Sequence, residues 1–131
     1  MNSTQINVAV VDDDPSICKS LERLLRASGF APLTYLSAEA FLQDRPRVIV
    51  DCMILDIHLG SMSGFELQKQ LAAAGELPPI IFITADEEPD TSERARQAGC
   101  IACFRKPFLG RKLLETIRSE VAEKKSINNL D

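Results

Sequence analysis

The sequence predicts an α/β protein whose sheet has five parallel strands, with helices on both faces. Three observations support this prediction: short apolar runs alternate with amphipathic stretches along the chain, glycines follow several of the amphipathic stretches, and most of the apolar runs end in polar residues. Strands and helices that alternate in sequence form a parallel sheet covered on both sides. We therefore expect a doubly wound sheet built from five strand–helix units.

The size and composition of the chain are typical of one globular domain, with 131 residues, 45% hydrophobic and 26% charged. We expect the folded domain at residues 5–125 and a polar tail that frays at residues 126–131. No apolar run approaches the roughly 18 to 20 residues that span a membrane, and the polar N-terminus lacks the features of a signal peptide. The expected location is therefore the cytoplasm. The net charge of −4 argues against broad binding of nucleic acid, which depends on a basic surface.

The first unit shows the pattern in detail. A largely β-branched run at Ile6–Val11 predicts the first strand, and three aspartates follow it. Asp14 and Pro15 are typical of the N-cap and first residue of a helix. Gly29 is placed to end this helix. The apolar residues of the helix recur at helical spacing and are Ile17, Leu21, Leu24 and Leu25.

The remaining elements repeat this pattern. Further strands are expected at residues 31–35, 48–55, 79–83 and 101–105. Ser63 and Glu66 form a capping box that opens one of the later helices. Asp51 lies inside the third apolar run, so we expect it to mark the strand's start or to have a partner for its carboxylate. Helices are expected at residues 37–43, 63–74, 90–98 and from about residue 113 to residue 121.

Polar residues follow or end four of the five predicted strands. Asp12 and Asp13 follow the first strand, Asp56 follows the third, Thr84 follows the fourth and Lys106 follows the fifth. In open parallel sheets, ligands bind outside the carboxyl ends of the strands. We therefore expect these five residues to converge at one edge of the sheet and to form the functional site.

Three carboxylates at one place need a positive partner. Two unit charges about 4 Å apart repel by roughly 4 kcal/mol at an effective dielectric constant of about 20. The Lys106 ammonium is one candidate partner and a hard divalent cation is another; Mg²⁺ in particular prefers oxygen ligands and keeps several waters. A carboxylate can also act as a nucleophile and become an aspartyl phosphate. Thr84 and Lys106 could then contact phosphoryl oxygens.

Four short motifs occur in order and with consistent spacing: VVDDD at 10–14, ILDIH at 54–58, ITAD at 83–86 and FRKPF at 104–108. With them, the chain resembles the receiver domain of bacterial two-component response regulators over essentially its whole folded length. No one motif is specific, but the combination of all four is. The resemblance implies a flavodoxin-like (βα)5 fold.

The resemblance also implies a function for the site. Asp56 would accept a phosphoryl group from a histidine kinase or phosphotransfer protein, and Thr84 and Lys106 would contact that group. The Lys106-Pro107 peptide bond would be cis. The domain would not be an enzyme, since it would assist only its own phosphorylation and dephosphorylation.

A magnesium ion and a regulated surface complete what the resemblance implies. Asp12, Asp13, Asp56 and the backbone carbonyl of His58 would bind Mg²⁺. Phosphorylation would change the face formed by the fourth helix, the fifth strand and the fifth helix, and so regulate a protein partner that the sequence does not identify. Homodimerisation on phosphorylation is left open, and no output domain is expected within these residues.

The sequence departs from the family pattern at three positions. An aromatic residue usually stands in the fifth strand three residues before the lysine, where this chain has Cys103, and Phe104 should face the opposite side of the sheet. This puts the usual coupling between threonine and aromatic ring in question. The loop at residues 59–64 lacks the usual proline and is expected to be more mobile. His58 either orients a water molecule or is a solvated loop residue.

The cysteines are expected to be free and buried, because a chain without a secretory segment rarely forms disulfides. Two of them have C-x-x-C spacing, but alternation along a strand would place them on opposite faces. A metal or redox site is therefore the less favoured interpretation. The four residues are Cys18, Cys52, Cys100 and Cys103.

Three other functions are alternatives. A Mg²⁺-dependent phosphohydrolase would use Asp56 as its nucleophile, but such enzymes usually place a second acid two residues later, where this chain has His58. A flavin-binding electron carrier would need a hydroxyl- and glycine-rich phosphate loop after the first strand, where this chain has the acidic segment 12–15. A degenerate receiver that only binds partners would lack key site residues, yet all five are present; Cys103 leaves this alternative open for the switch and not for the site.

Overall fold

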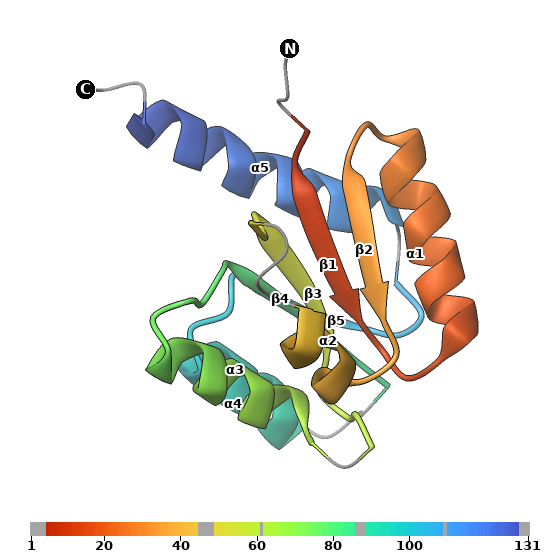
Figure 1. The fold of residues 1–131 in the computed structure, drawn as a ribbon, viewed down its shortest axis with the longest axis vertical. Coiled ribbons are helices and arrows are strands. Elements are labelled where there is room, and N and C mark those ends of the chain that lie inside the picture. Colours follow the sequence, from red (N-terminus) through yellow and green to blue (C-terminus); the bar gives the residue numbers. More distant parts are fainter. Residues whose placement is uncertain (1–4, 45–48, 61, 86–88, 109, 129–131) are drawn as a thin grey trace.

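The structure is a computed structural model that describes residues 5–44, 49–60, 62–85, 89–108 and 110–128. Its centre is one sheet of five parallel strands in the order β2-β1-β3-β4-β5 (Figure 1). The strands are β1 (Asn7–Val11), β2 (Ala31–Tyr35), β3 (Cys52–Asp56), β4 (Ile80–Thr84) and β5 (Ala102–Arg105). The predicted fold class is therefore confirmed.

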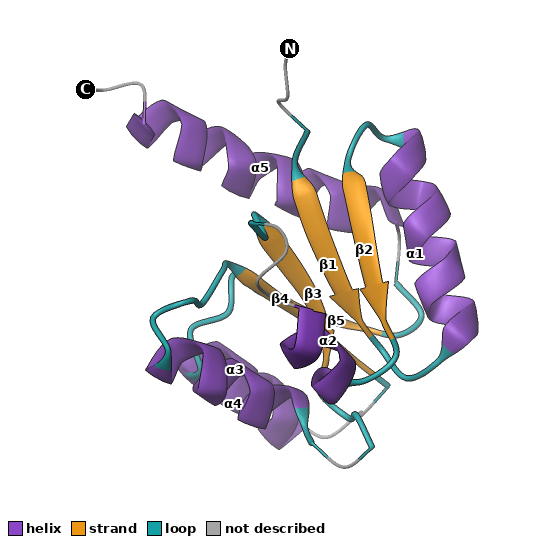
Figure 2. Ribbon diagram, viewed as in Figure 1, coloured by secondary structure: helices purple, strands orange, loops and turns teal. Residues whose placement is uncertain are grey.

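Helices cover both faces of the sheet (Figure 2). On one face lie α1 (Pro15–Ala27) and α5 (Gly110–Asn128), and on the other lie α2 (Ala38–Asp44), α3 (Gly64–Ala73) and α4 (Pro89–Gln97). Because side chains alternate along a strand, the sheet contributes to two separate apolar cores, one under each layer of helices. No helix in the described ranges is long and apolar enough to cross a membrane.

The helix signals in the sequence operate as expected. The Asp14 carboxylate accepts a hydrogen bond from the Ser16 N–H at 2.9 Å and caps α1, with Pro15 as the first helical residue. Ser63 and Glu66 form both hydrogen bonds of the capping box at the start of α3. These caps satisfy backbone N–H groups that have no partner inside a helix, so they fix where α1 and α3 leave the carboxyl edge of the sheet.

The third strand is shorter than predicted. β3 begins at Cys52, whereas the apolar run had indicated a strand from residue 48. The reason lies at the amino edge of the sheet, where the Asn7 N–H donates to Asp51 Oδ2 at 2.8 Å and the Asn7 side chain donates to the Ile49 carbonyl at 2.8 Å. Asp51 therefore has the partner expected for it, and Ile49, 79% exposed, lies before the buried strand.

The start of β5 also differs from the prediction. Cys100 precedes the strand, which begins at Ala102, so strand alternation does not relate Cys100 to Cys103. The expectation of opposite faces is wrong, because both side chains pack against the core beneath α2, α3 and α4. Cys103 and Phe104 do alternate as predicted, since Phe104 packs against the core beneath α1 and α5. All four cysteines are free; two are buried and two are partly buried.

The last helix extends further than predicted. α5 continues through Asn128, so residues 126–128 are helical where a fraying tail was expected. The preceding segment, residues 122–125, consists of Ala, Glu and Lys, which are strong helix formers and carry the helix beyond its apolar stripe. Residues 129–131 lie outside the described part of the chain.

Two isoleucines, one inside β3 and one before it, provide a test of the strand's start. Ile54 has no exposed surface and Ile49 is 79% exposed. We expect Ile54→Ala to lower the free energy of unfolding by about 2 to 5 kcal/mol, the usual cost of truncating a buried isoleucine. Ile49→Ala removes the same atoms and should change it by no more than about 0.5 kcal/mol. Urea unfolding followed by circular dichroism measures both, and equal losses would contradict the placement of β3.

Candidate functional site

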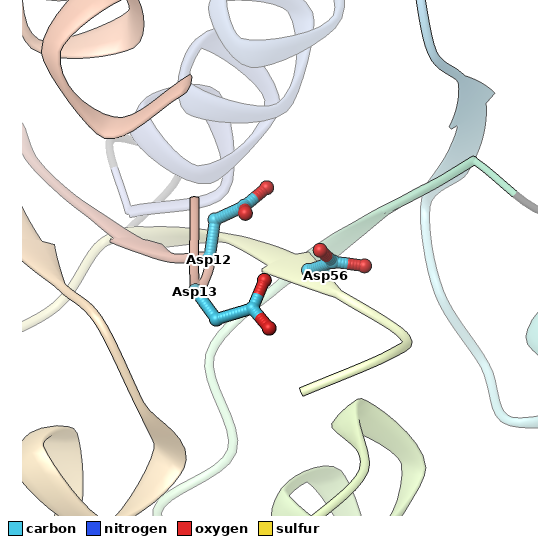
Figure 3. A group of neighbouring side chains, drawn as sticks. All are labelled: Asp12, Asp13 and Asp56. Atoms are coloured by element: carbon cyan, nitrogen blue, oxygen red, sulfur yellow. The ribbon is translucent and has the colours of Figure 1, made fainter. Parts of the chain in front are cut away.

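The carboxyl ends of the strands bring acidic side chains together. Asp12 and Asp13 follow β1, and Asp56 is the last residue of the adjacent strand β3. Figure 3 shows the three side chains projecting into one region, and each offers a carboxylate oxygen that lies within 4.8 Å of the others. The convergence predicted from the strand ends is therefore present for these three aspartates, as an acidic cluster at the centre of the sheet edge.

Two members of this acidic cluster are buried and one is exposed. Asp12 has no exposed surface and Asp56 is 4% exposed, whereas Asp13 is exposed. Burial of Asp12 follows from the sheet order, because β1 lies between β2 and β3. An open hollow of about 380 Å³ is lined by Asp13, His58 and Glu66, among others. Solvent therefore reaches the acidic cluster from the side of Asp13.

The lysine after β5 balances part of this charge. Lys106 Nζ lies 2.8 Å from Asp12 Oδ2 and 3.1 Å from Asp56 Oδ2. Burial alone would lower the pKa of Lys106, but its contacts with Asp12 and Asp56 outweigh burial and raise the pKa above its ordinary value. The ammonium therefore stays charged between the two buried carboxylates. The Lys106-Pro107 peptide bond is cis, as the resemblance implied.

The carboxyl group of Asp56 is harder to ionise than an ordinary aspartate. Burial raises the pKa of Asp56 above 3.8, and the charge of Asp12 raises it further. The hydrogen bond from the His58 N–H, at 3.0 Å to Asp56 Oδ1, and the Lys106 ammonium act in the opposite direction without cancelling the rise. The ammonium and the hydrogen bond therefore do not offset the burial of Asp56 and the charge of Asp12.

The donor set fits a hard metal ion. Apart from its ion pair with Lys106, the buried Asp12 Oδ2 has no hydrogen-bond partner in the described part of the chain. Three carboxylates with one side open to solvent match the preference of Mg²⁺ for a few carboxylate oxygens together with water. The acidic cluster can therefore bind a metal ion. A role for the His58 carbonyl in binding that ion stays a prediction.

Thr84 and Cys103 lie on the neighbouring strands β4 and β5. Thr84 is 2% exposed at the end of β4, and its carbonyl accepts the Lys106 N–H at 2.7 Å, so the threonine and the lysine are joined through their backbones. Cys103 is partly buried and pairs in register with Phe82 of β4. Asp86, the last residue of the ITAD motif, lies outside the described residues.

Two contacts at the site were not predicted. The Cys18 S–H donates to the Asp12 carbonyl at 3.2 Å, and its burial raises the pKa of the Cys18 thiol to about 11, so the thiol remains a neutral donor. Gly64, the first residue of α3, lies directly against the backbone of Asp56. A sequence signal existed for Gly64, because glycine is a poor choice in the first turn of a helix that already has Ser63 as its cap.

These features define a class of protein: an α/β domain with an acidic, metal-competent site and a partly buried lysine at the carboxyl edge of its sheet. Residues 8–118 match the family model described as "Response regulator receiver domain". The chain belongs to this family, and it is a receiver domain of two-component signalling. Response regulators interact with histidine kinases or phosphotransfer proteins.

Individual relatives agree with the family match. The chain is 38% identical over 119 residues to "Response regulator protein TmoT" of Ectopseudomonas mendocina. The aligned region covers 91% of this chain and 54% of TmoT. A solved response regulator receiver protein from Burkholderia phymatum is 38% identical, with a TM-score of 0.80 over 90% of this chain and 96% of that one. A CheY-like receiver domain from Methanospirillum hungatei is 25% identical, with a TM-score of 0.85 over 94% and 98%. The chain spans about half the length of the curated relatives that it matches first.

The raised pKa of Asp56 predicts how stability depends on pH. The folded-state pKa of Asp56 is above that of the unfolded chain, so the folded state binds more protons between the two values. Stability from this group is therefore gained as the pH falls through the raised pKa and is lost above it. In metal-free buffer at neutral pH, we expect Asp56→Asn to be more stable than the unmodified protein, with a difference that shrinks in mildly acidic buffer. Urea unfolding with a chelator at both pH values measures this, and a pH-independent difference would contradict it.

Proposed function

We propose that the domain is a phosphoacceptor switch, in which Asp56 receives a phosphoryl group from a phosphorylated histidine of a kinase or phosphotransfer protein. The observation that carries the proposal is the position of the Asp56 carboxylate. It is buried, it contacts Lys106, and it lies beside two further carboxylates that can hold a metal ion. A carboxylate so placed is suited to nucleophilic attack on phosphorus.

The transfer exchanges one bond to phosphorus for another. An Asp56 carboxylate oxygen forms the new P–O bond, the P–N bond to the donor imidazole breaks, and its electron pair stays with the imidazole. Phosphoryl transfer of this kind depends mostly on positioning and on charge stabilisation. Lys106, already 3.1 Å from Asp56 Oδ2, is placed to stabilise negative charge on the transferred oxygens. The Thr84 hydroxyl is expected to donate to one of them.

A magnesium ion would balance the negative charge of the acidic cluster that Lys106 leaves uncompensated. Asp12, Asp13 and Asp56 would hold it, with the His58 carbonyl as a further ligand. When bound, Mg²⁺ would neutralise the charge of the phosphoryl oxygens and so reduce their repulsion by the carboxylates. Asp13 is the exposed member of the set, and would allow exchange of the ion and its waters with solvent.

The effect of phosphorylation would be transmitted to the protein surface through β4 and β5. The modification adds roughly one to two negative charges and several strong acceptors next to Lys106 and Thr84. Rearrangement of these residues would move the start of α4 and the face formed by α4, β5 and α5. Because Cys103 stands at the usual aromatic position, this coupling would depend on backbone and helix movement and not on an aromatic ring.

The biological setting is also proposed. The domain would assist only its own phosphorylation and dephosphorylation, and would act on no other substrate. It would work in the cytoplasm and regulate a downstream protein, or an attached domain in a longer protein, with homodimerisation on phosphorylation as one route. The first curated relatives that it matches are about twice as long, which supports the attached-domain form.

The direct test of the transfer is intact mass after incubation with acetyl phosphate. We expect a gain of one phosphoryl group that requires Mg²⁺ and is absent in Asp56→Asn. Asp51→Asn is the matched control, since Asp51 lies at the opposite edge of the sheet with Asn7 as its partner. A gain that persists in Asp56→Asn, or no gain in the unmodified protein with Mg²⁺, would contradict the proposal.

Variants of two neighbouring aspartates distinguish direct binding of the metal ion from a general effect of negative charge. Asp13→Asn should weaken Mg²⁺ binding by at least about tenfold, the loss typical of even an outer-shell change at a metal site. Asp14→Asn makes the same change of charge one residue later and keeps a good N-cap for α1. Asp14→Asn should therefore leave the dissociation constant for Mg²⁺ nearly unchanged. Isothermal titration with MgCl₂ measures both variants, and equal effects would show that Asp13 acts only through its long-range charge.

A further inference from the structure

Helix α3 begins in direct contact with the backbone of Asp56. A side-chain Cβ at Gly64 would overlap the Asp56 carbonyl oxygen and would lie 3.0 Å from Ile57 Cα and 3.1 Å from the Asp56 carbonyl carbon. All three obstacles are backbone atoms, which cannot rotate away as a side chain can. Only glycine therefore allows α3 to start where it does.

The need for glycine at this position is a matter of space. Gly64 is not among the glycines with positive φ, so its backbone conformation is open to other residues. Gly60, four residues earlier in the same connection, has nothing within 4 Å of the place where a Cβ would stand. The close approach is therefore a property of Gly64 and not of the whole β3–α3 connection.

The connection between β3 and α3 is hydrogen-bonded at both ends to the end of β3 or the residue after it. At its start, Asp56 Oδ1 accepts the His58 N–H at 3.0 Å. At its end, the Gly64 N–H donates to the Ile57 carbonyl at 2.8 Å, and the Ser63 capping box holds the first turn of the helix. The peptide of Asp56, its carboxylate and the start of α3 thus form one contiguous unit.

We infer that Gly64 is a positioning residue for the phosphoacceptor. By letting α3 rest on the Asp56 peptide, it sets the direction of the Asp56 carboxylate, and the course of the segment that carries His58, relative to Asp12 and Asp13. Gly64 touches only the backbone of Asp56, so it acts through that residue. The inference rests on the proposed function, since it names a residue that the same site requires.

Two glycine-to-alanine variants test this inference. Gly64→Ala should weaken Mg²⁺ binding by about tenfold or more, as outer-shell changes at metal sites typically do. It should also slow phosphorylation by acetyl phosphate at saturating Mg²⁺, by up to about a hundredfold, because small misplacements of reacting groups have effects of this size. Gly60→Ala should behave like the unmodified protein in both measurements. Both are made at a temperature where circular dichroism shows each variant to be fully folded.

The affinity for Mg²⁺ and the rate of phosphorylation distinguish a positioning role of Gly64 from a role in packing alone. A Gly64→Ala protein with a lower Tm but unchanged Mg²⁺ affinity and unchanged rate would overturn the inference. If Gly64→Ala does not fold, Ser63→Ala replaces it, because it loosens the start of α3 without adding an atom near Asp56. Weaker Mg²⁺ binding in Ser63→Ala would support the inference, and unchanged binding would overturn it.

Failure of the proposed function has a different signature. If the unmodified protein binds Mg²⁺ but takes up no phosphoryl group, the switch proposal fails while the Mg²⁺ comparison still decides the role of Gly64. If the unmodified protein binds no Mg²⁺, both fail together, because there is then no ion for the carboxylates to hold.

Discussion

The ion pair that Lys106 makes with two buried carboxylates is the interaction on which the site depends. Its ammonium lies within 3.1 Å of both Asp12 and Asp56, which come from neighbouring strands at the centre of the sheet. Removing the ammonium would leave two buried carboxylates without a counter-charge, which costs several kcal/mol. One positive charge does not balance three carboxylates, and burial keeps the pKa of Asp56 raised. The site is therefore held together and still has a set of carboxylate oxygens that can hold a further cation.

The rest of the fold can be understood as support for this arrangement. β1 and β3 are buried on both faces, so Asp12, which follows β1, and Asp56, which ends β3, are both placed in the buried centre of the sheet edge. The Thr84 carbonyl accepts the backbone N–H of Lys106 and fixes the lysine to β4. On the other side, α3 rests on the Asp56 peptide through Gly64. Under the proposed function, a change of charge at Asp56 would therefore act on β4, β5 and α3 together.

Much of this could be predicted from the sequence, because local rules decide it. Strand ends placed Asp12, Asp56 and Lys106 at one edge, and the Asp14 cap fixed the start of α1. The start of β3 could not be predicted, because it depends on the contact between Asn7 and Asp51, which are far apart in sequence.

Two other features could not be predicted from the sequence, for similar reasons. The shared face of Cys100 and Cys103 depends on β5 beginning only at Ala102, and element boundaries are poorly specified by local sequence. The close approach of Gly64 to Asp56 exists only once α3 is docked on the sheet.

The central claim, that an oxygen of Asp56 carries the phosphoryl group, is tested most directly by borohydride reduction after treatment with acetyl phosphate and Mg²⁺. Reduction converts an aspartyl phosphate to homoserine, which fragment masses assign to one position. The account predicts conversion at Asp56 alone, and conversion at Asp12 or Asp13 would contradict it.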